Sequence, residues 1–166
     1  MNSTNRNLMK HITIGFSKSR KKFAVGSWLI RWYMETPYSH VYVKFHSDSL
    51  NRDLVYEAVG SGVRFIGEKK WQSHAEEVAS FSIQVPDDKY ADLVKYCIDN
   101  AGDEYGFLQN IGIVIAGVFN EKFNRFNDGM NCSENTYNIA NLLGIVINKD
   151  KNLITPKDLY QKLSTL

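Results

Sequence analysis

The helix around which this chain is organised has the sequence Asn131-Cys132-Ser133-Glu134-Asn135-Thr136-Tyr137-Asn138-Ile139-Ala140-Asn141-Leu142-Leu143, and it follows the polar loop 127–130. Tyr137, Ala140 and Leu143 recur at helical spacing. Asn131 is a good N-cap residue, and Glu134 stands three positions later, where the acid of a capping box belongs. The pattern therefore predicts a helix that begins directly after Asn131.

Cys132 is then the first residue of this helix. Unpaired N–H groups and the helix dipole at this position favour a thiolate, which is the reactive form of cysteine. The alternative is a small cysteine that only fills the core at a helix start. A nucleophilic role needs a base, and the rest of the chain has to supply it.

The composition is that of one soluble domain. The chain has 166 residues, of which 43% are hydrophobic and 23% charged, so it can bury a core of its own. We expect residues 1–10 to be a flexible tail and residues 11–166 to form the domain. A net charge of +2 is too small to indicate nucleic acid as a partner. The basic run 18–22 is interpreted as a solvated loop, with contact to a phosphate or an anionic surface as the alternative.

Two cysteines are too few for a disulfide framework, and neither has the spacing of a metal ligand. No metal or other cofactor is therefore expected. Cys97 lies in a helical pattern and is interpreted as a core residue. The N-terminus has no signal-peptide pattern, and the longest apolar run, 111–119, is far shorter than the ~20 residues of a transmembrane helix. We expect a protein made in the cytoplasm, reduced, without a transmembrane segment.

Secondary-structure signals predict an α+β fold. Strand patterns occur at 11–16, 39–45, 54–59, 62–66 and 78–85, and the tight-turn signal Gly60-Ser61 joins two of them. The short connections predict an antiparallel sheet or meander. Helical patterns occur at 23–34, 86–100, 105–119, 132–143 and 156–163, the last with Thr155 as cap. Segment 105–119 is interpreted as one buried helix or two short ones, with a partner-binding or membrane-touching segment as the alternative.

His40 and Glu57 are the candidates for a base and its orienting group. His40 begins a strand, which would place its side chain at the rim of the sheet. Glu57 lies in the otherwise apolar run Val55-Tyr56-Glu57-Ala58, where a carboxylate is costly unless it is paired. If the two strands are neighbours, the carboxylate can orient the imidazole. A rim histidine and an outward-facing strand residue are the plainer interpretations. His11, His46 and His74 lack the spacing for a site.

Four motifs occur in a recognisable order: Pro37-Tyr38-Ser39-His40-Val41, Val55-Tyr56-Glu57-Ala58 with Gly62-Val63, Asn131-Cys132-Ser133-Glu134, and Thr155-Pro156-Lys157-Asp158-Leu159-Tyr160. Together they resemble the circularly permuted branch of the NlpC-type papain-like superfamily, the YiiX/YaeF-like thiol hydrolases. In that branch the histidine strand precedes the cysteine helix. One departure is the polar pair Asn135-Thr136, where family members usually carry apolar residues.

The resemblance implies a permuted papain-like fold, in which an antiparallel sheet or small barrel packs against a helix with the catalytic cysteine at its N-terminus. It also implies Cys132 as nucleophile, His40 as base and Glu57 as the third member of a triad. The backbone N–H groups of Cys132 and Ser133 would form the oxyanion site. Tyr38 and Tyr105 are further candidates for the substrate pocket.

The activity that the resemblance implies is hydrolysis through a thioester acyl-enzyme. Its first expected substrate is an amide bond in peptidoglycan peptides, because NlpC-type relatives cut such bonds. A bacteriophage product could reach the wall by delivery to the envelope or within a virion, next to phage structural proteins. One alternative is a lipid or acyl ester or amide hydrolase, or an acyltransferase, with the same triad. The other is a non-enzymatic virion or assembly protein that retains the fold.

Overall fold

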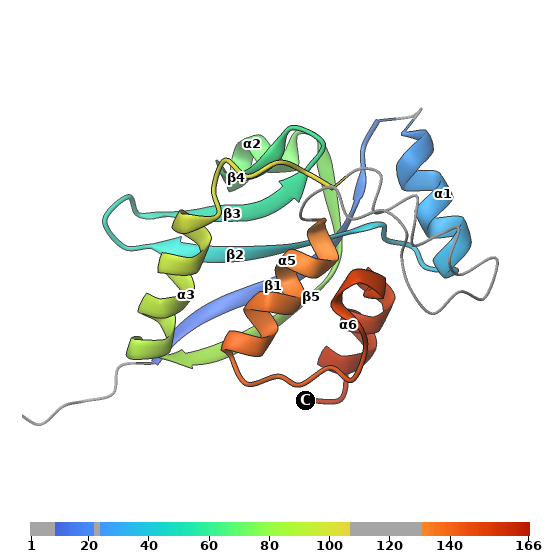
Figure 1. Cartoon of the computed structure of the whole chain (residues 1–166). Helices are drawn as coiled ribbons and strands as arrows, with labels where there is room; N and C mark the ends of the chain where they lie inside the picture. Colours follow the sequence, from blue (N-terminus) through green and yellow to red (C-terminus); the bar gives the residue numbers. More distant parts are fainter. Residues whose placement is uncertain (1–8, 22–23, 107–130) are drawn as a thin grey trace, which may run out of the picture.

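The computed structural model describes residues 9–21, 24–106 and 131–166. In chain order its elements are β1 (Met9–Ser19), α1 (Val25–Met34), β2 (His40–Ser47), β3 (Arg52–Val59), β4 (Gly62–Gly67), α2 (Glu68–Gln72), β5 (Ala75–Pro86), α3 (Asp87–Asp99), α5 (Cys132–Leu142) and α6 (Pro156–Leu163), with the 3-10 turn Lys151–Leu153 before α6 (Figure 1). The apolar segment from 107 to 119 lies outside the described residues. None of the described helices has the length and apolar character needed to cross a membrane.

The five strands form one open antiparallel sheet in the order β4-β3-β2-β1-β5. Strands β1 to β4 follow one another as a meander, as the short connections predict. Strand β5 then returns to pair with β1 at the other edge, because α2 carries the chain across the sheet between β4 and β5. Within the described residues β4 and β5 do not pair, so the antiparallel sheet is confirmed and the small barrel is wrong.

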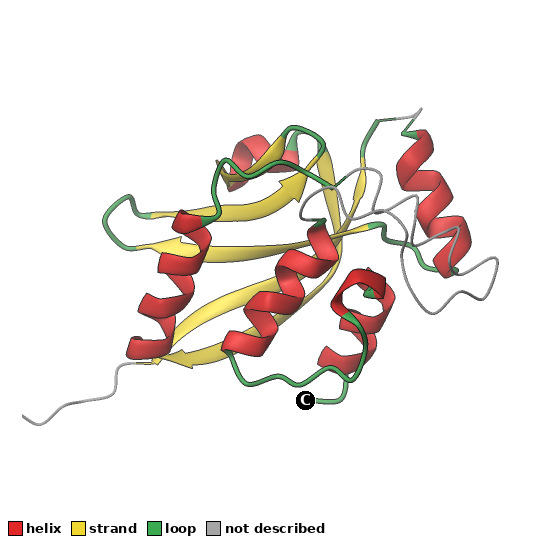
Figure 2. Cartoon of the chain, viewed as in Figure 1, coloured by secondary structure: helices red, strands yellow, loops and turns green. Residues whose placement is uncertain are grey.

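The two faces of the sheet carry different layers. Helices α3, α5 and α6 cover one face (Figure 2) and close the main core there. Its members include Ile14, Val43, Leu93, Ile139 and Leu159. The short helix α2 covers part of the other face, where Trp71 packs against Tyr42 with their ring centroids 4.4 Å apart. Two separate apolar layers therefore lie on opposite sides of β2 and β3.

The predicted starts of α3, α5 and α6 are confirmed. Helix α5 begins at Cys132, and the Asn131 side chain accepts a hydrogen bond from the backbone N–H of Glu134 at 2.9 Å. Helix α6 begins after Thr155, which forms a capping box with Asp158. Helix α3 begins at Asp87, with two acids in its first turn.

The polar pair Asn135-Thr136, at which the sequence departs from the resemblance, is fully buried. Its Asn135 Oδ1 accepts hydrogen bonds from the hydroxyls of Tyr56 and Tyr96 at 3.3 and 3.4 Å. Buried polar groups are tolerated when they are hydrogen-bonded in this way. The tyrosine hydroxyls therefore compensate for the amide inside the core.

The largest differences from the prediction are at strand β1 and helix α2. Strand β1 begins at Met9 and continues to Ser19, so Lys18 belongs to the strand and not to a basic loop. The cause is β5, which pairs with β1 from Met9–Pro86 to Ser19–Ala75. Helix α2 was not predicted, because its five residues are too short to show a helical period.

Gly15 provides a test of the packing on the α2 face. In the β1–β2 register it lies opposite Tyr42, and a methyl group added at Gly15 would overlap the Tyr42 ring. The ring is held there by Trp71 and by a hydrogen bond from its hydroxyl to Glu77. We predict that Gly15→Ala lowers the free energy of unfolding by about 1–3 kcal/mol, the usual cost of overpacking.

Chemical denaturation would measure this change. The matched control is Gly26→Ala in α1, where an added methyl group meets no atom within 4 Å. This control should leave the free energy of unfolding unchanged or raise it, because alanine favours helix. Equal stability of Gly15→Ala and wild type would contradict the packing described here.

Candidate active site

Cys132 occupies the first position of α5 and is 4% exposed. The first N–H groups of a helix have no partner within the helix. The Asn131 side chain takes the N–H of Glu134, and the Asn131 carbonyl takes that of Asn135. The N–H groups of Cys132 and Ser133, at the first two positions of the helix, have no acceptor within α5. They can therefore act as hydrogen-bond donors beside the thiol, where the sequence predicts an oxyanion site.

His40 is the first residue of β2, and Glu57 lies in the neighbouring strand β3. Val43 lies opposite Tyr56 in the register, so by alternation His40 and Glu57 both project from the α2 face. His40 Nε2 is 3.2 Å from Glu57 Oε2. The predicted pairing of the carboxylate with the histidine is therefore present in the structure.

Two further residues donate hydrogen bonds to Glu57. Arg64 Nε and Nη2 donate to Glu57 Oε1 at 3.1 and 2.7 Å, and Trp71 Nε1 donates to Oε2 at 3.1 Å. Oε1 is thus held by Arg64, whereas Oε2 is shared by the Trp71 indole and the His40 ring. Only 1% of the Glu57 side chain is exposed. Hydrogen bonds and charge together compensate for burying this carboxylate.

Sequence reasoning missed Arg64, Trp71 and His74. A signal for Arg64 was available in the sequence. If Gly60-Ser61 is a two-residue hairpin turn, Val59 pairs with Gly62 and Glu57 therefore lies opposite Arg64. The structure has this register between β3 and β4. Trp71 lies on the unpredicted helix α2. His74, which has no partner apparent in the sequence, lies 3.7 Å from Glu57 Oε1, and its Nδ1 is 3.0 Å from the Lys70 carbonyl.

The pKa values of the three side chains shift together. Burial raises the pKa of Glu57, but His40 and Arg64 outweigh burial and lower it to about 2. Burial lowers the pKa of His40, but the Cys132 thiolate and Glu57 outweigh it and raise the value to about 10. Burial raises the thiol pKa of Cys132, but the charge and hydrogen bonding of His40 lower it below its ordinary value. The arrangement thus favours a thiolate–imidazolium pair.

Two smaller contacts support the thiolate. A hydrogen bond with the backbone of Val41, next to His40, lowers the Cys132 pKa further, and so does the Ser133 hydroxyl. Ser133 Oγ is 4.0 Å from Cys132 Sγ. By contrast, burial raises the pKa of Cys97, which lies in the main core. The two thiols of the chain therefore differ in the direction of their shifts.

Tyr38 and Tyr105, the predicted residues of the substrate pocket, pack in or against the main core. Tyr38 is 5% exposed, and its ring lies 5.1 Å from that of Phe16 and 5.3 Å from that of Tyr160. Burial and the neighbouring Tyr160 raise the pKa of Tyr38 to about 12. Tyr105 packs against the main core. Both tyrosines thus have packing roles, and their contact with a substrate stays a prediction.

No protein-family model matches the chain, and no curated protein matches its sequence. A solved structure that resembles it is that of the metalloprotein YiiX from Escherichia coli O157:H7, with a TM-score of 0.60. The superposition covers 93% of this chain and 92% of YiiX, and 17% of the residues are identical. The chain has the fold of YiiX. At this identity the likeness concerns the fold alone.

YiiX carries the description of a metalloprotein, so the placement of metal-binding side chains in this chain is relevant. In ranges 9–21, 24–106 and 131–166, no group of three or more His, Cys, Asp and Glu side chains is placed to hold a metal ion. Near Glu57, the carboxylate oxygens are held by Arg64, Trp71 and His40. The described donors therefore fit a proton-transfer site better than a metal site.

The shifted pKa values predict how Cys132 is alkylated. Because the thiol pKa is lowered, the rate of Cys132 with iodoacetamide should fall less in wild type than that of an ordinary thiol as the pH falls from about 8 to 6. In His40→Ala the thiolate loses its cation and burial raises the thiol pKa. Its rate should therefore fall about tenfold per pH unit over this range.

Mass spectrometry of quenched peptides would measure both rates. Cys97→Ala is the matched control and should retain the wild-type profile. Labelling of Cys97 as fast as that of Cys132, or the same slope with and without His40, would show that Cys132 is not activated.

Proposed function

We propose that this protein is a thiol hydrolase in which Cys132 is the nucleophile, His40 the base and Glu57 the group that orients His40. One observation carries the proposal: His40 is hydrogen-bonded to the buried Glu57 and lowers the pKa of a thiol at a helix N-terminus. A nucleophile, a base and an orienting group in this relation form the arrangement of cysteine hydrolases.

In the first step the Cys132 thiolate attacks the carbonyl carbon of the substrate, and a C–S bond forms as the carbonyl π bond opens. The negative charge moves to the carbonyl oxygen. The N–H groups of Cys132 and Ser133 at the start of α5 are the donors that stabilise it, aided by the positive end of the helix. These donors are fixed by the backbone, so they need not reorganise during the reaction.

The tetrahedral intermediate then expels the leaving group. His40 Nε2 faces Glu57, so Nδ1 is the ring nitrogen that remains for the thiol side. The imidazolium gives its proton to the leaving amine or alcohol, and a thioester on Cys132 remains. His40, now neutral, takes a proton from water as the water attacks the thioester. The C–S bond then breaks and its electron pair returns to sulfur, so the carboxylic acid leaves. Cys132 is again a thiolate, and His40, which holds the proton taken from water, is again an imidazolium.

Glu57 acts through His40 in this scheme. As a carboxylate with its pKa lowered to about 2, it stays ionised at neutral pH and stabilises the imidazolium. Arg64 and Trp71 fix its two oxygens, so the imidazole plane is fixed in turn. They are positioning residues for the same reaction.

The chain order histidine, glutamate, cysteine matches the permuted branch of the NlpC-type superfamily, and we propose this relationship. On this basis, amide bonds of peptidoglycan peptides are the first substrate class. A phage-encoded chain would meet them during entry or lysis. A second class, acyl esters or amides of lipids, is favoured by the exposed aromatic residues of α1, the helix that leads into the His40 strand.

We predict that Cys132→Ala abolishes turnover, by at least about 10⁴-fold, since the thiol that forms the acyl-enzyme in this scheme is removed. The assay would offer muropeptides and acyl esters in parallel and follow products by mass. Cys97→Ala is the control and should keep the wild-type rate. Equal losses in both variants would contradict the assignment of Cys132. Turnover of esters without muropeptides would reject the cell-wall substrate, and no turnover of either class would reject the hydrolase.

Glu57→Gln should slow turnover roughly tenfold or more, because the amide carries no charge to hold the imidazolium. The descending limb of the pH–rate profile should also move to lower pH, since Glu57 raises the pKa of His40. Glu68→Gln is the control: its carboxylate pairs with Lys44 at 3.0 Å, away from His40. An unchanged rate and profile in Glu57→Gln would remove Glu57 from the mechanism.

A further inference from the structure

Helix α1 carries an exposed apolar face that the proposed chemistry does not use. Val25, Trp28 and Trp32 are 71%, 58% and 62% exposed. They recur at helical spacing and so share one side of the helix. The two indole rings lie nearly parallel, at 16°, with centroids 6.5 Å apart. We call these three residues the α1 face.

The opposite side of α1 attaches the helix to the domain. Met34 is buried there, and Ser27 Oγ is 2.5 Å from Ser39 Oγ, next to His40. These attachments do not involve the α1 face. Large exposed indoles on a helix that is already anchored are typical of an interaction surface.

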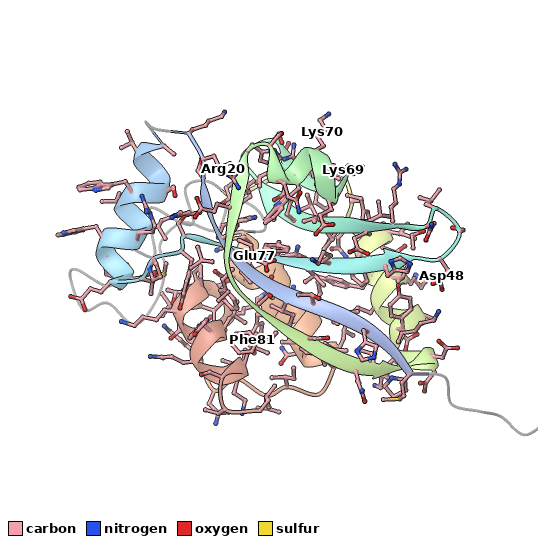
Figure 3. The ribbon with its side chains drawn as sticks, turned by 180° about the vertical axis from the view of Figure 1, so that it is seen from behind. Arg20, Asp48, Lys69, Lys70, Glu77 and Phe81 are labelled. Carbon is pink, nitrogen blue, oxygen red and sulfur yellow. The ribbon has the colours of Figure 1, made fainter. Side chains whose placement is uncertain are left out.

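Cations lie at the start of this helix. Arg20 and Lys21 are exposed, and neither forms an ion pair with a carboxylate of the described residues, whereas Lys18 pairs with Glu76 at 3.1 Å. Figure 3 shows Arg20 near the end of β1, with Lys69 and Lys70 on the neighbouring α2. The backbone N–H of Arg20 donates a hydrogen bond to the carbonyl of His74, just after α2. This contact brings Arg20 to the side of the molecule where Lys69 and Lys70 lie (Figure 3). Arg20 and Lys21, which have no carboxylate partner among the described residues, thus precede the helix that carries the α1 face.

We propose that the α1 face docks on the surface of a lipid bilayer that contains anionic phospholipids. Tryptophan is enriched where hydrocarbon meets headgroups, because its ring is apolar and its N–H can bond to polar groups. Lysine and arginine beside such a face attract the negative headgroups. Single-stranded nucleic acid would also stack on indoles, but it needs a charged groove that tracks its backbone, and α1 presents a convex surface.

The docking has a consequence for the candidate active site. Only residues 35–39 separate α1 from His40, and the Ser27–Ser39 contact couples the two. A bilayer bound at α1 would therefore lie at the end of the sheet where His40 begins its strand. This docking does not depend on hydrolysis and can be tested without it.

The test is sedimentation of the full chain with vesicles of phosphatidylcholine, with and without phosphatidylglycerol. Wild type should bind the anionic vesicles, less so at high salt, and its emission should shift to the blue. Trp71 is 2% exposed, so Trp28 and Trp32 would report the shift. Trp28→Ala with Trp32→Ala should weaken binding by about tenfold or more. Ile98→Ala with Val146→Ala, equally exposed residues elsewhere, should leave binding unchanged.

Charge is tested by Lys21→Glu against Lys89→Glu, an exposed lysine on α3 with the same charge change. Only Lys21→Glu should weaken binding. No vesicle binding by wild type, equal binding to neutral and anionic vesicles, or binding that survives loss of both indoles would overturn the proposal. So would a tryptophan-dependent dimer, or RNA binding, in place of vesicle binding. Thermal unfolding of each variant should match wild type, because the replaced side chains are exposed.

Discussion

The buried carboxylate of Glu57 is the group on which the candidate site depends. It lies in an apolar strand, and an unpaired charge there would cost several kcal/mol. Three elements supply its partners: β4 gives Arg64, α2 gives Trp71 and β2 gives His40. One side chain thus contacts the β3–β4 hairpin, the short helix α2 and the first residue of β2. The same contacts that make its burial tolerable also orient the imidazole.

The site joins the two sides of the sheet. Cys132 belongs to the main core under α3, α5 and α6, whereas Glu57 is held with Trp71 on the α2 face. His40 can meet both because it is the first residue of β2, at the end of the sheet. A residue in the middle of the strand would reach only one side. The position of His40 at a strand end is therefore what lets a carboxylate on one face influence a thiol on the other.

Much of this arrangement could be predicted from local patterns. Alternation predicted the strands of the meander, and cap residues predicted where α5 and α6 begin. Glu57 was singled out because a carboxylate in an apolar strand needs a partner, and the structure provides one. The partner Trp71 could not be predicted, because α2 is too short to show a period and its contact is set by tertiary packing. The extension of β1 to Met9 likewise depends on pairing with β5, which is distant in sequence.

The most direct test of the central claim is the charge of His40, read from ¹⁵N NMR shifts of its ring nitrogens. The chain has four histidines, so the His40 signals would be assigned by their loss in His40→Gln. The account predicts an imidazolium at about pH 8, where an ordinary histidine is neutral, because the Cys132 thiolate and Glu57 raise the His40 pKa to about 10. In Cys132→Ala the thiolate is gone, and the pKa should fall. A neutral His40 at about pH 8 in wild type, or no change on removal of the thiol, would contradict the account.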